Sequence, residues 1–182
     1  MGSTPHLPAW AVVSAERRAH IERVAALIDR WAVAMRLPAA ERARWAKAAW
    51  LHDALRDAPV AELTEWAALP GAPEELLHGP AAAARARSEG ETDQGLLDAV
   101  RYHSIGSDKW DAAGRALYCA DFLEPGRSFD REVRAGLADR FPSDPDGVFR
   151  DVVRTRLLWL IRSGWPLPDP TVRLWNSLAT PE

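Results

Sequence analysis

The chain has 182 residues, is 47% hydrophobic and 27% charged, and carries a formal net charge of −3. That length can bury a core without disulfides or a structural metal, and the composition is that of an ordinary globular protein. The charge excludes a general attraction to nucleic acid or to an anionic membrane, and the single cysteine, Cys119, excludes an internal disulfide. The N-terminus MGSTPHLPAW lacks the pattern of a signal peptide, so we expect a cytoplasmic protein with neither a nucleic-acid nor a membrane partner.

Two long helices are expected at the start of the chain. The first runs from about Ala9 to Met35, and its apolar face recurs at steps of three and four residues. That face comprises His20, Val24, Leu27, Trp31 and Met35. The second helix runs from about Ala39 to Leu55 and carries His52 on one face with Trp45 and Ala48. Both histidines are therefore expected to point toward the protein interior.

Shorter helical segments account for the rest of the chain. They are expected at about residues 60–69, 73–88, 92–104, 112–123, 130–141 and 148–164, before a proline-punctuated tail, 165–178, with a last short helix. Gly79 and Pro80 should end one helix and begin another within the second segment. We find no alternating pattern of a strand and no linker that divides the chain. The sequence therefore predicts an all-α helical bundle that forms a single domain over residues 1–182.

Histidines and aspartates recur at intervals of about one helix plus a connection. They are His20, the adjacent pair His52 and Asp53, His78, His103 and Asp121. Successive helices could therefore deliver these side chains to one centre, as metal-binding bundles do. Imidazole combined with carboxylate suits iron, manganese or zinc better than calcium.

The pair His52 and Asp53 lies in WLHDALRD, residues 50–57, a segment that otherwise has the pattern of a buried helix. Burying a carboxylate without a partner is strongly unfavourable. A lone inward histidine is more often a core residue than a ligand, but four of them with two carboxylates would each need a separate hydrogen-bond partner. A shared divalent cation satisfies all of these groups together, and we therefore predict a metal centre.

Five motifs occur in a fixed order along the chain. They are RRAH at 17–20, LHDALRD at 51–57, LLHGP at 76–80, AVRYHSIG at 99–106 and ADFLEPGR at 120–127. Together with Pro168, Thr171 and Asn176 in the closing stretch, they resemble the HD superfamily of metal-dependent phosphohydrolases, in particular its YqeK-type branch. The resemblance covers about residues 12–178, and the ordered set of motifs is far more specific than the adjacent His-Asp pair alone.

The resemblance implies an all-helical HD domain in which one or two divalent ions are bound, iron first and manganese as the alternative. The implied iron ligands are His20, His52, Asp53 and Asp121. His78 and His103 would hold a second ion or contact substrate phosphate. The implied activity is symmetrical cleavage of diadenosine tetraphosphate to two ADP. Two departures, Arg56 for the usual lysine and Ser104 for the usual threonine, keep the chemical type and bear on nucleotide preference more than on the reaction.

The expected mechanism is attack by a metal-bound water on a phosphorus in line with the departing ADP. Asp53 and Arg56 are the expected catalytic partners. Asp57 could hold a water, orient His52, or only pair with Arg56. The residues expected to contact substrate are Arg17, His78, His103, Ser104, Gly106, Arg127, Thr171 and Asn176. The arginines are chosen because a guanidinium matches phosphate oxygens, although any one of them could equally be a solvated surface residue.

Other functions stay open at this level. The same ligands would serve a nucleotidase or a nucleotide pyrophosphatase acting on another mononucleotide, whereas a cyclic-nucleotide phosphodiesterase is less favoured because no sensor or receiver domain is fused to the chain. A non-catalytic, nucleotide-binding helical module is an alternative of a different class. A serine or cysteine nucleophile has little support, since no G-x-S-x-G motif occurs. Nine tryptophans leave room for a homodimer contact.

Overall fold

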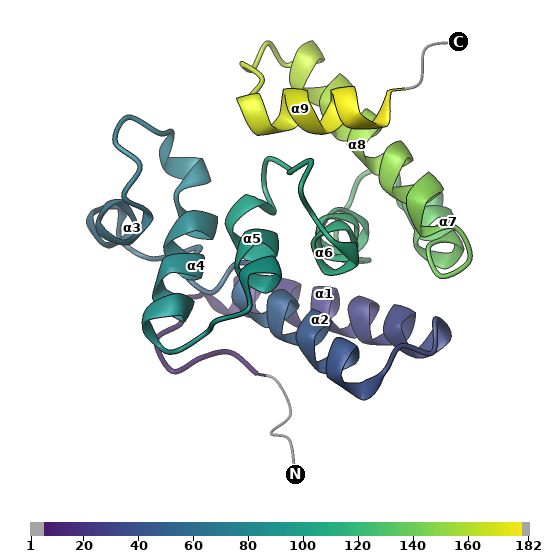
Figure 1. Ribbon diagram of the computed structural model, residues 1–182. Helices are drawn as coiled ribbons and strands as arrows, with labels where there is room; N and C mark the ends of the chain where they lie inside the picture. The colour runs from purple at the N-terminus through teal and green to yellow at the C-terminus, as the bar shows by residue number, and fades with distance from the viewer. Residues whose placement is uncertain (1–5, 180–182) are drawn as a thin grey trace.

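The computed structural model describes residues 6–179, and within that range it contains helices and no strand (Figure 1). The ends of the predicted domain, residues 1–5 and 180–182, lie outside the described residues. In chain order the helices are α1 Ala15–Ala34, α2 Ala39–Leu51, α3 Val60–Ala67, the 3-10 helix η1 Glu74–Leu76, α4 His78–Ser88, α5 Gln94–Tyr102, α6 Ala112–Leu123, α7 Arg131–Arg140, α8 Pro145–Arg162 and α9 Asp169–Leu178. The all-α prediction is confirmed.

The first helix begins later than its periodicity suggests. The side chain of Ser14 accepts a hydrogen bond from the backbone N–H of Arg17, at 3.2 Å, and so caps α1 at Ala15 rather than at Ala9. The residues before the cap pair instead with the turn that follows α2: the N–H of Val12 donates to the carbonyl oxygen of Ala54 at 2.8 Å. The predicted start at Ala9 was therefore wrong, because the cap and this pairing compete with helix formation.

The second helix also ends earlier than predicted, at Leu51 instead of Leu55. Residues 52–57 form successive turns, in which the N–H of Ala54 donates to Leu51 and the N–H of Arg56 donates to Asp53. His52 still has helical φ and ψ of −55° and −41° and donates its N–H to Ala48, so the chain leaves α-helical geometry only after this residue. His52 and Asp53 are both buried.

The helix α6 lies at the centre of the fold. All of its residues from Ala116 to Leu123 are buried, and it packs against α1, α2, α5, α7 and α8. A helix that is covered on every side needs small and apolar residues around its whole circumference, which AAGRALYCADFL supplies. Within the buried stretch from Ala116 to Leu123, Asp121 is the charged exception, and its burial points to a partner in the interior.

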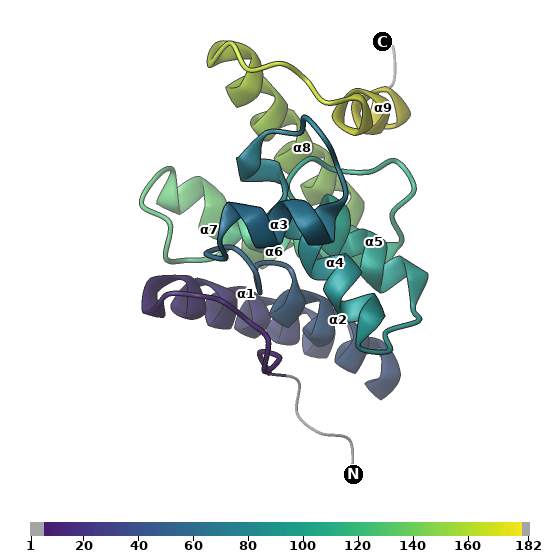
Figure 2. The same ribbon diagram turned by 90° about the vertical axis from the view of Figure 1, so that its left-hand side faces the viewer.

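Two pairs of packed helices cover different sides of the core. In Figure 1, α1 and α2 pack together along the bottom of the view, while α9 lies above the connection that follows α5. Figure 2 shows α3 and α4 covering a further side, next to α5. In the described part of the chain, no helix is long and apolar enough to cross a bilayer.

Candidate metal centre

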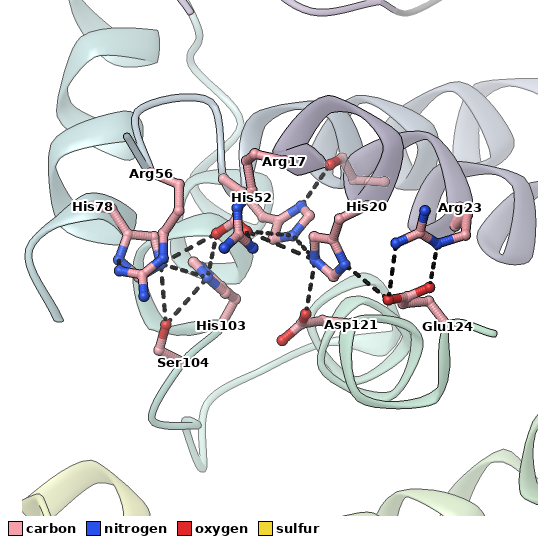
Figure 3. Close-up of polar contacts among 12 residues, drawn as sticks. Arg17, His20, Arg23, His52, Arg56, His78, His103, Ser104, Asp121 and Glu124 are labelled. Carbon is pink, nitrogen blue, oxygen red and sulfur yellow. Dashed lines mark hydrogen bonds and ion pairs between the residues drawn. The ribbon is translucent and has the colours of Figure 1, made fainter. Parts of the chain in front are cut away.

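The six side chains singled out by their spacing come together in the interior. All are buried, and they come from α1, the turn after α2, the start of α4, the end of α5, and α6 (Figure 3). They are His20, His52, Asp53, His78, His103 and Asp121. Residues about a hundred positions apart thus share one site, which follows from the central place of α6 between α1, α2 and α5.

Asp53 lies between two pairs of imidazoles. The Nε2 atoms of His20 and His52 are 3.4 Å apart, and each lies about as far, 3.7 and 3.6 Å, from Oδ2 of Asp53. On the other side, the Nε2 atoms of His78 and His103 are 3.0 Å apart and lie 3.2 and 3.4 Å from Oδ1. Asp53 and either pair of histidines form a group of three ligand atoms that all lie within 4.8 Å of one another. Such a group could hold a metal ion.

The outer nitrogens of three of these rings are held by protein oxygens. Nδ1 of His52 lies 2.7 Å from the carbonyl oxygen of Ala49, and Nδ1 of His103 lies 2.8 Å from that of Val100. Nδ1 of His20 lies 3.1 Å from a carboxylate oxygen of Glu124. Since these oxygens only accept hydrogen bonds, each ring donates through Nδ1 and turns Nε2 to the centre, as metal-binding histidines usually do.

The charges of the site favour a cation. Burial by itself would lower the pKa of His20, but its hydrogen bonds to the accepting carboxylates of Asp121 and Glu124 outweigh burial and raise that pKa to about 9, and a metal cation could take the place of this proton. Burial would raise the pKa of Asp53, but the neighbouring histidines hold it well below its usual range, and His20 and Arg127 do the same for Asp121. These carboxylates stay ionised in the interior, and nitrogen and oxygen donors of this kind fit a divalent metal such as iron, manganese or zinc.

Glu124, which the sequence reasoning missed, belongs to the site. It is buried, its Oε2 accepts hydrogen bonds from Nε of Arg23 and the N–H of Gly126, both at 2.6 Å, and its Oε1 contacts His20. Burial would raise its pKa, but these contacts lower it to about 2. The available signal was an acidic residue three positions after Asp121, at the end of an otherwise apolar helix.

Arg156, from α8, was missed as well. Its guanidinium donates to the carbonyl oxygen of Ser104 at 2.9 Å, lies 3.6 Å from Oδ2 of Asp121, and stands over the ring of Tyr118 at 4.5 Å. The sequence held no signal for this contact, because Arg156 is one of many arginines on an amphipathic helix and only packing selects it.

Several predicted substrate contacts border the cluster. Arg17 donates to Oδ2 of Asp53 at 2.7 Å, and Arg127 donates to Oδ1 of Asp121 at 2.6 Å. The hydroxyl of Ser104 lies 3.1 Å from Nε2 of His103. Arg56 contacts Nδ1 of His78 at 3.2 Å, so it too borders the site.

Other predicted site residues are occupied elsewhere. Asp57 is exposed and accepts a hydrogen bond from the N–H of Ser14 at 2.7 Å. Thr171 donates to the carbonyl oxygen of Ile105 at 2.6 Å, and Gly106 packs beneath α9. Asn176 is exposed on α9. Three of these four therefore join chain segments to one another, and none of the four has a described contact with the histidine cluster.

Comparison with known proteins agrees with this arrangement. Residues 17–140 match the HD domain family. Two relatives, each named "Bis(5'-nucleosyl)-tetraphosphatase, symmetrical", come from Halalkalibacterium halodurans and Bacillus subtilis. They are 28% identical over 106 residues and 30% identical over 109 residues. Each match covers 58% of this chain and 56% of the relative, so it spans little more than half the length of either protein.

A solved structure has a similar fold. It is described as a predicted HD superfamily hydrolase involved in NAD metabolism from Clostridium acetobutylicum. Its TM-score is 0.77 at 23% sequence identity, and the match covers 91% of this chain and 90% of that one. With 91% of the chain covered, the likeness in fold extends beyond residue 140.

Proposed function

The chain belongs to the HD domain family, and on that basis we propose that it is a metal-dependent phosphohydrolase that cleaves diadenosine tetraphosphate symmetrically to two ADP. The observation that carries this proposal is the buried convergence of four imidazoles with two ionised carboxylates. The names of the two relatives support both the substrate and the reaction.

We propose His20, His52, Asp53 and Asp121 as the metal ligands, with iron as the first choice of metal and manganese as the second. The nearest donor atoms of His20, His52 and Asp53 lie 3.4–3.7 Å apart, and Asp121 lies 3.2 Å from Nε2 of His20. A bound divalent ion would supply a water activated at neutral pH and would offset phosphoryl charge. Glu124 keeps the imidazole of His20 oriented for that purpose.

The chain's own cations would bind the polyphosphate. The side chains of Arg17 and Arg127 are 29% and 34% exposed, so solvent reaches them although they contact buried carboxylates. The exposed parts of both guanidinium groups can donate to phosphoryl oxygens. Ser104 and Arg56 offer further donors at the opposite end of the cluster. We leave Asp57 out of this machinery because Ser14 engages its carboxylate.

The test is to identify the products. Iron-loaded protein is incubated with diadenosine tetraphosphate, and the nucleotides are separated by chromatography. We expect ADP alone, and we expect Asp53→Asn, which keeps the shape of the side chain and removes its charge, to produce none. ATP plus AMP would refute symmetrical cleavage, and turnover of other nucleotides alone would favour the nucleotidase. Binding without turnover in a metal-replete sample would favour the nucleotide-binding module.

For assembly and location, we propose a homodimer in the cytoplasm. Large apolar side chains are exposed near the end of α8, among them Trp159, Ile161 and Trp165. Exposed apolar side chains that lie close together are typical of protein contacts. Sedimentation velocity over a range of concentrations should show a dimer that Trp159→Lys dissociates, and a wild-type protein that sediments as a monomer throughout would exclude it. Cell fractionation tests the location.

A further inference from the structure

We propose that Arg134 is a positioning residue, which ties the loop of residues 124–130 to the end of α6 and thereby directs Arg127 toward the substrate phosphates. This inference rests on the proposed function, because it takes Arg127 as a phosphate ligand. It adds a residue of α7 that lies outside the histidine cluster. The inference starts from the burial of a cation that has no carboxylate beside it.

Arg134 carries an unusual buried charge. It is only 3% exposed, and within residues 6–179 its guanidinium forms no ion pair. A buried cation is strongly unfavourable unless its hydrogen-bond donors are satisfied. All three of its nitrogens donate to backbone carbonyl oxygens, which are those of Phe122, Glu124, Arg127 and Phe129. The side chain is therefore committed to one short segment of the chain.

Two of these carbonyl groups lie at the C-terminal end of α6. The last carbonyl groups of a helix have no partner within it, and the helix dipole places partial negative charge there. Nε of Arg134 donates to the carbonyl oxygen of Phe122 at 2.9 Å, and Nη2 donates to that of Glu124. The guanidinium therefore stabilises the end of α6 at the point where the chain leaves the helix.

The other two carbonyl groups lie in the loop itself. Nη1 of Arg134 donates to the carbonyl oxygen of Arg127 at 3.1 Å and to that of Phe129 at 3.2 Å. The guanidinium also stands over the ring of Phe129, 4.8 Å from its centroid. Among the described residues, no backbone–backbone hydrogen bond joins two members of 125–129. Side-chain contacts therefore hold this loop, and Arg134 makes several of them.

Arg127 is the loop residue that faces the site. Its Nε donates to the carbonyl oxygen of Asp121 at 3.0 Å, and its Nη2 donates to the carboxylate of Asp121 at 2.6 Å. No described contact engages its Nη1, and 34% of the side chain is exposed, so this nitrogen can meet a phosphoryl oxygen. Because Arg134 holds the carbonyl group of Arg127, it fixes the backbone from which that side chain extends. Loss of Arg134 should leave Arg127 present but poorly placed.

Amide hydrogen exchange tests the loop contacts without substrate. Exchange in peptides that cover residues 124–130 is followed by mass spectrometry in the Mn²⁺-loaded protein. We expect faster exchange in Arg134→Met, an intermediate rate in Arg134→Lys, which keeps the charge but not the planar fork, and the wild-type rate in Arg131→Met. Arg131 is the matched control, because it is exposed on the same helix and has no described contact with these carbonyl groups. Wild-type exchange in Arg134→Met, or in Arg134→Lys if the methionine variant does not fold, would overturn the proposal.

A double-mutant cycle tests whether Arg134 acts through Arg127. The dissociation constant of ADP, the product of the proposed reaction, is measured by calorimetry with Mn²⁺-loaded protein. We expect Arg127→Ala to bind ADP about 10-fold more weakly, as for loss of a charge-assisted hydrogen bond, and Arg134→Met to show part of that loss. The double variant should bind no more weakly than Arg127→Ala, because a residue that only places Arg127 has no effect once Arg127 is absent. Losses that multiply in the double variant would overturn the proposal.

Two further outcomes separate this inference from the proposed function. A Mn²⁺ content that falls in Arg134→Met would place this residue in support of the metal centre and overturn its assignment to Arg127. A wild-type protein that neither binds ADP nor cleaves diadenosine tetraphosphate would refute the proposed function and, with it, the phosphate-binding role of Arg127. The exchange measurement would still decide whether Arg134 holds the loop.

Discussion

At the scale of single residues, the site depends on groups that orient the ligands as much as on the ligands. Glu124 is the clearest case, because it reaches His20 from outside the cluster while Arg23 and the N–H of Gly126 hold its carboxylate. Carboxylate partners of this kind set the tautomer of a metal-binding histidine and raise its basicity. Replacement of such a partner leaves the ligands in place and weakens their hold on the metal.

We predict that Glu124→Gln lowers the affinity for Mn²⁺ by about 10- to 100-fold, as loss of an outer partner typically does. Calorimetric titration of the metal-free protein measures this affinity. The matched control is Arg23→Met, which removes one partner of the carboxylate but leaves its contact with His20, and which should change the affinity much less. Equal affinities in Glu124→Gln and the wild type would contradict the prediction.

At the scale of helices and loops, α9 holds the connection that carries His103 and Ser104. Thr171 donates to the carbonyl oxygen of Ile105, and Gly106 has a positive φ of 87° directly beneath Leu174. A Cβ atom at Gly106 would lie 2.5 Å from Cδ2 of Leu174. The backbone conformation therefore favours glycine at this position, and a side chain here would force Leu174 to move.

We predict that Gly106→Ala destabilises the protein and loosens this connection. The left-handed conformation alone costs a non-glycine residue about 1–3 kcal/mol, and the contact with Leu174 adds to this. The matched control is Gly71→Ala, at a φ of 77° with no atom within 4 Å of the new Cβ, which should show the conformational cost alone. Denaturant unfolding measures both changes, and an equal loss in the two variants would show that α9 does not clamp the connection.

A second prediction at this scale concerns the start of α5. Asp93 accepts from the N–H of Leu96 and from Nε of Arg44, and the bond to Arg44 is the main reason that its pKa lies below the ordinary value of 3.8. A carboxyl whose pKa is lower in the folded protein stabilises it above its unfolded pKa. That stabilisation is lost as the pH falls through the folded pKa.

The variant Asp93→Asn keeps a capping side chain but loses the charge, so its stability deficit should be present at pH 7 and shrink below about pH 4. Asp93→Ala also loses the cap, which typically costs about 1 kcal/mol. The difference between the two variants should therefore not depend on pH. Urea unfolding at pH 3 and pH 7 checks both expectations, and a deficit of Asp93→Asn that grows on acidification would refute the assignment.

At the scale of the whole molecule, the cluster connects elements from nearly two thirds of the chain around α6. Without a cation, Asp53 and Asp121 depend on histidines and arginines to stay ionised in the interior. An ion that binds only the folded chain would stabilise all of these elements together. The prediction that residues 1–182 form a single domain requires that this stabilisation appear in one cooperative transition.

We predict that metal removal lowers the thermal midpoint. A ligand at 100 times its dissociation constant adds about 2.7 kcal/mol, which for a protein of this size corresponds to roughly 5–10 °C. Scanning calorimetry of Mn²⁺-loaded and chelator-treated protein measures the shift, which should be absent in Asp53→Asn. A comparable shift in that variant would place the metal elsewhere, and two separate transitions would refute the single domain.

Sequence by itself determined the helical class and the approximate positions of the helices, because apolar periodicity and capping are local properties. It also singled out the four histidines and two aspartates, since buried polar groups at intervals of one helix need a common partner. The start of α1 and the end of α2 were wrong by several residues, because the pairing of Val12 with Ala54 is not a local contact.

Only the tertiary structure decided which other residues belong to the site. Glu124 and Arg156 join it, while Asp57, Gly106 and Thr171 turn to contacts between chain segments. The physical reason is the same in each case: a side chain's residue type sets what it can donate or accept, and packing alone decides which partner it meets.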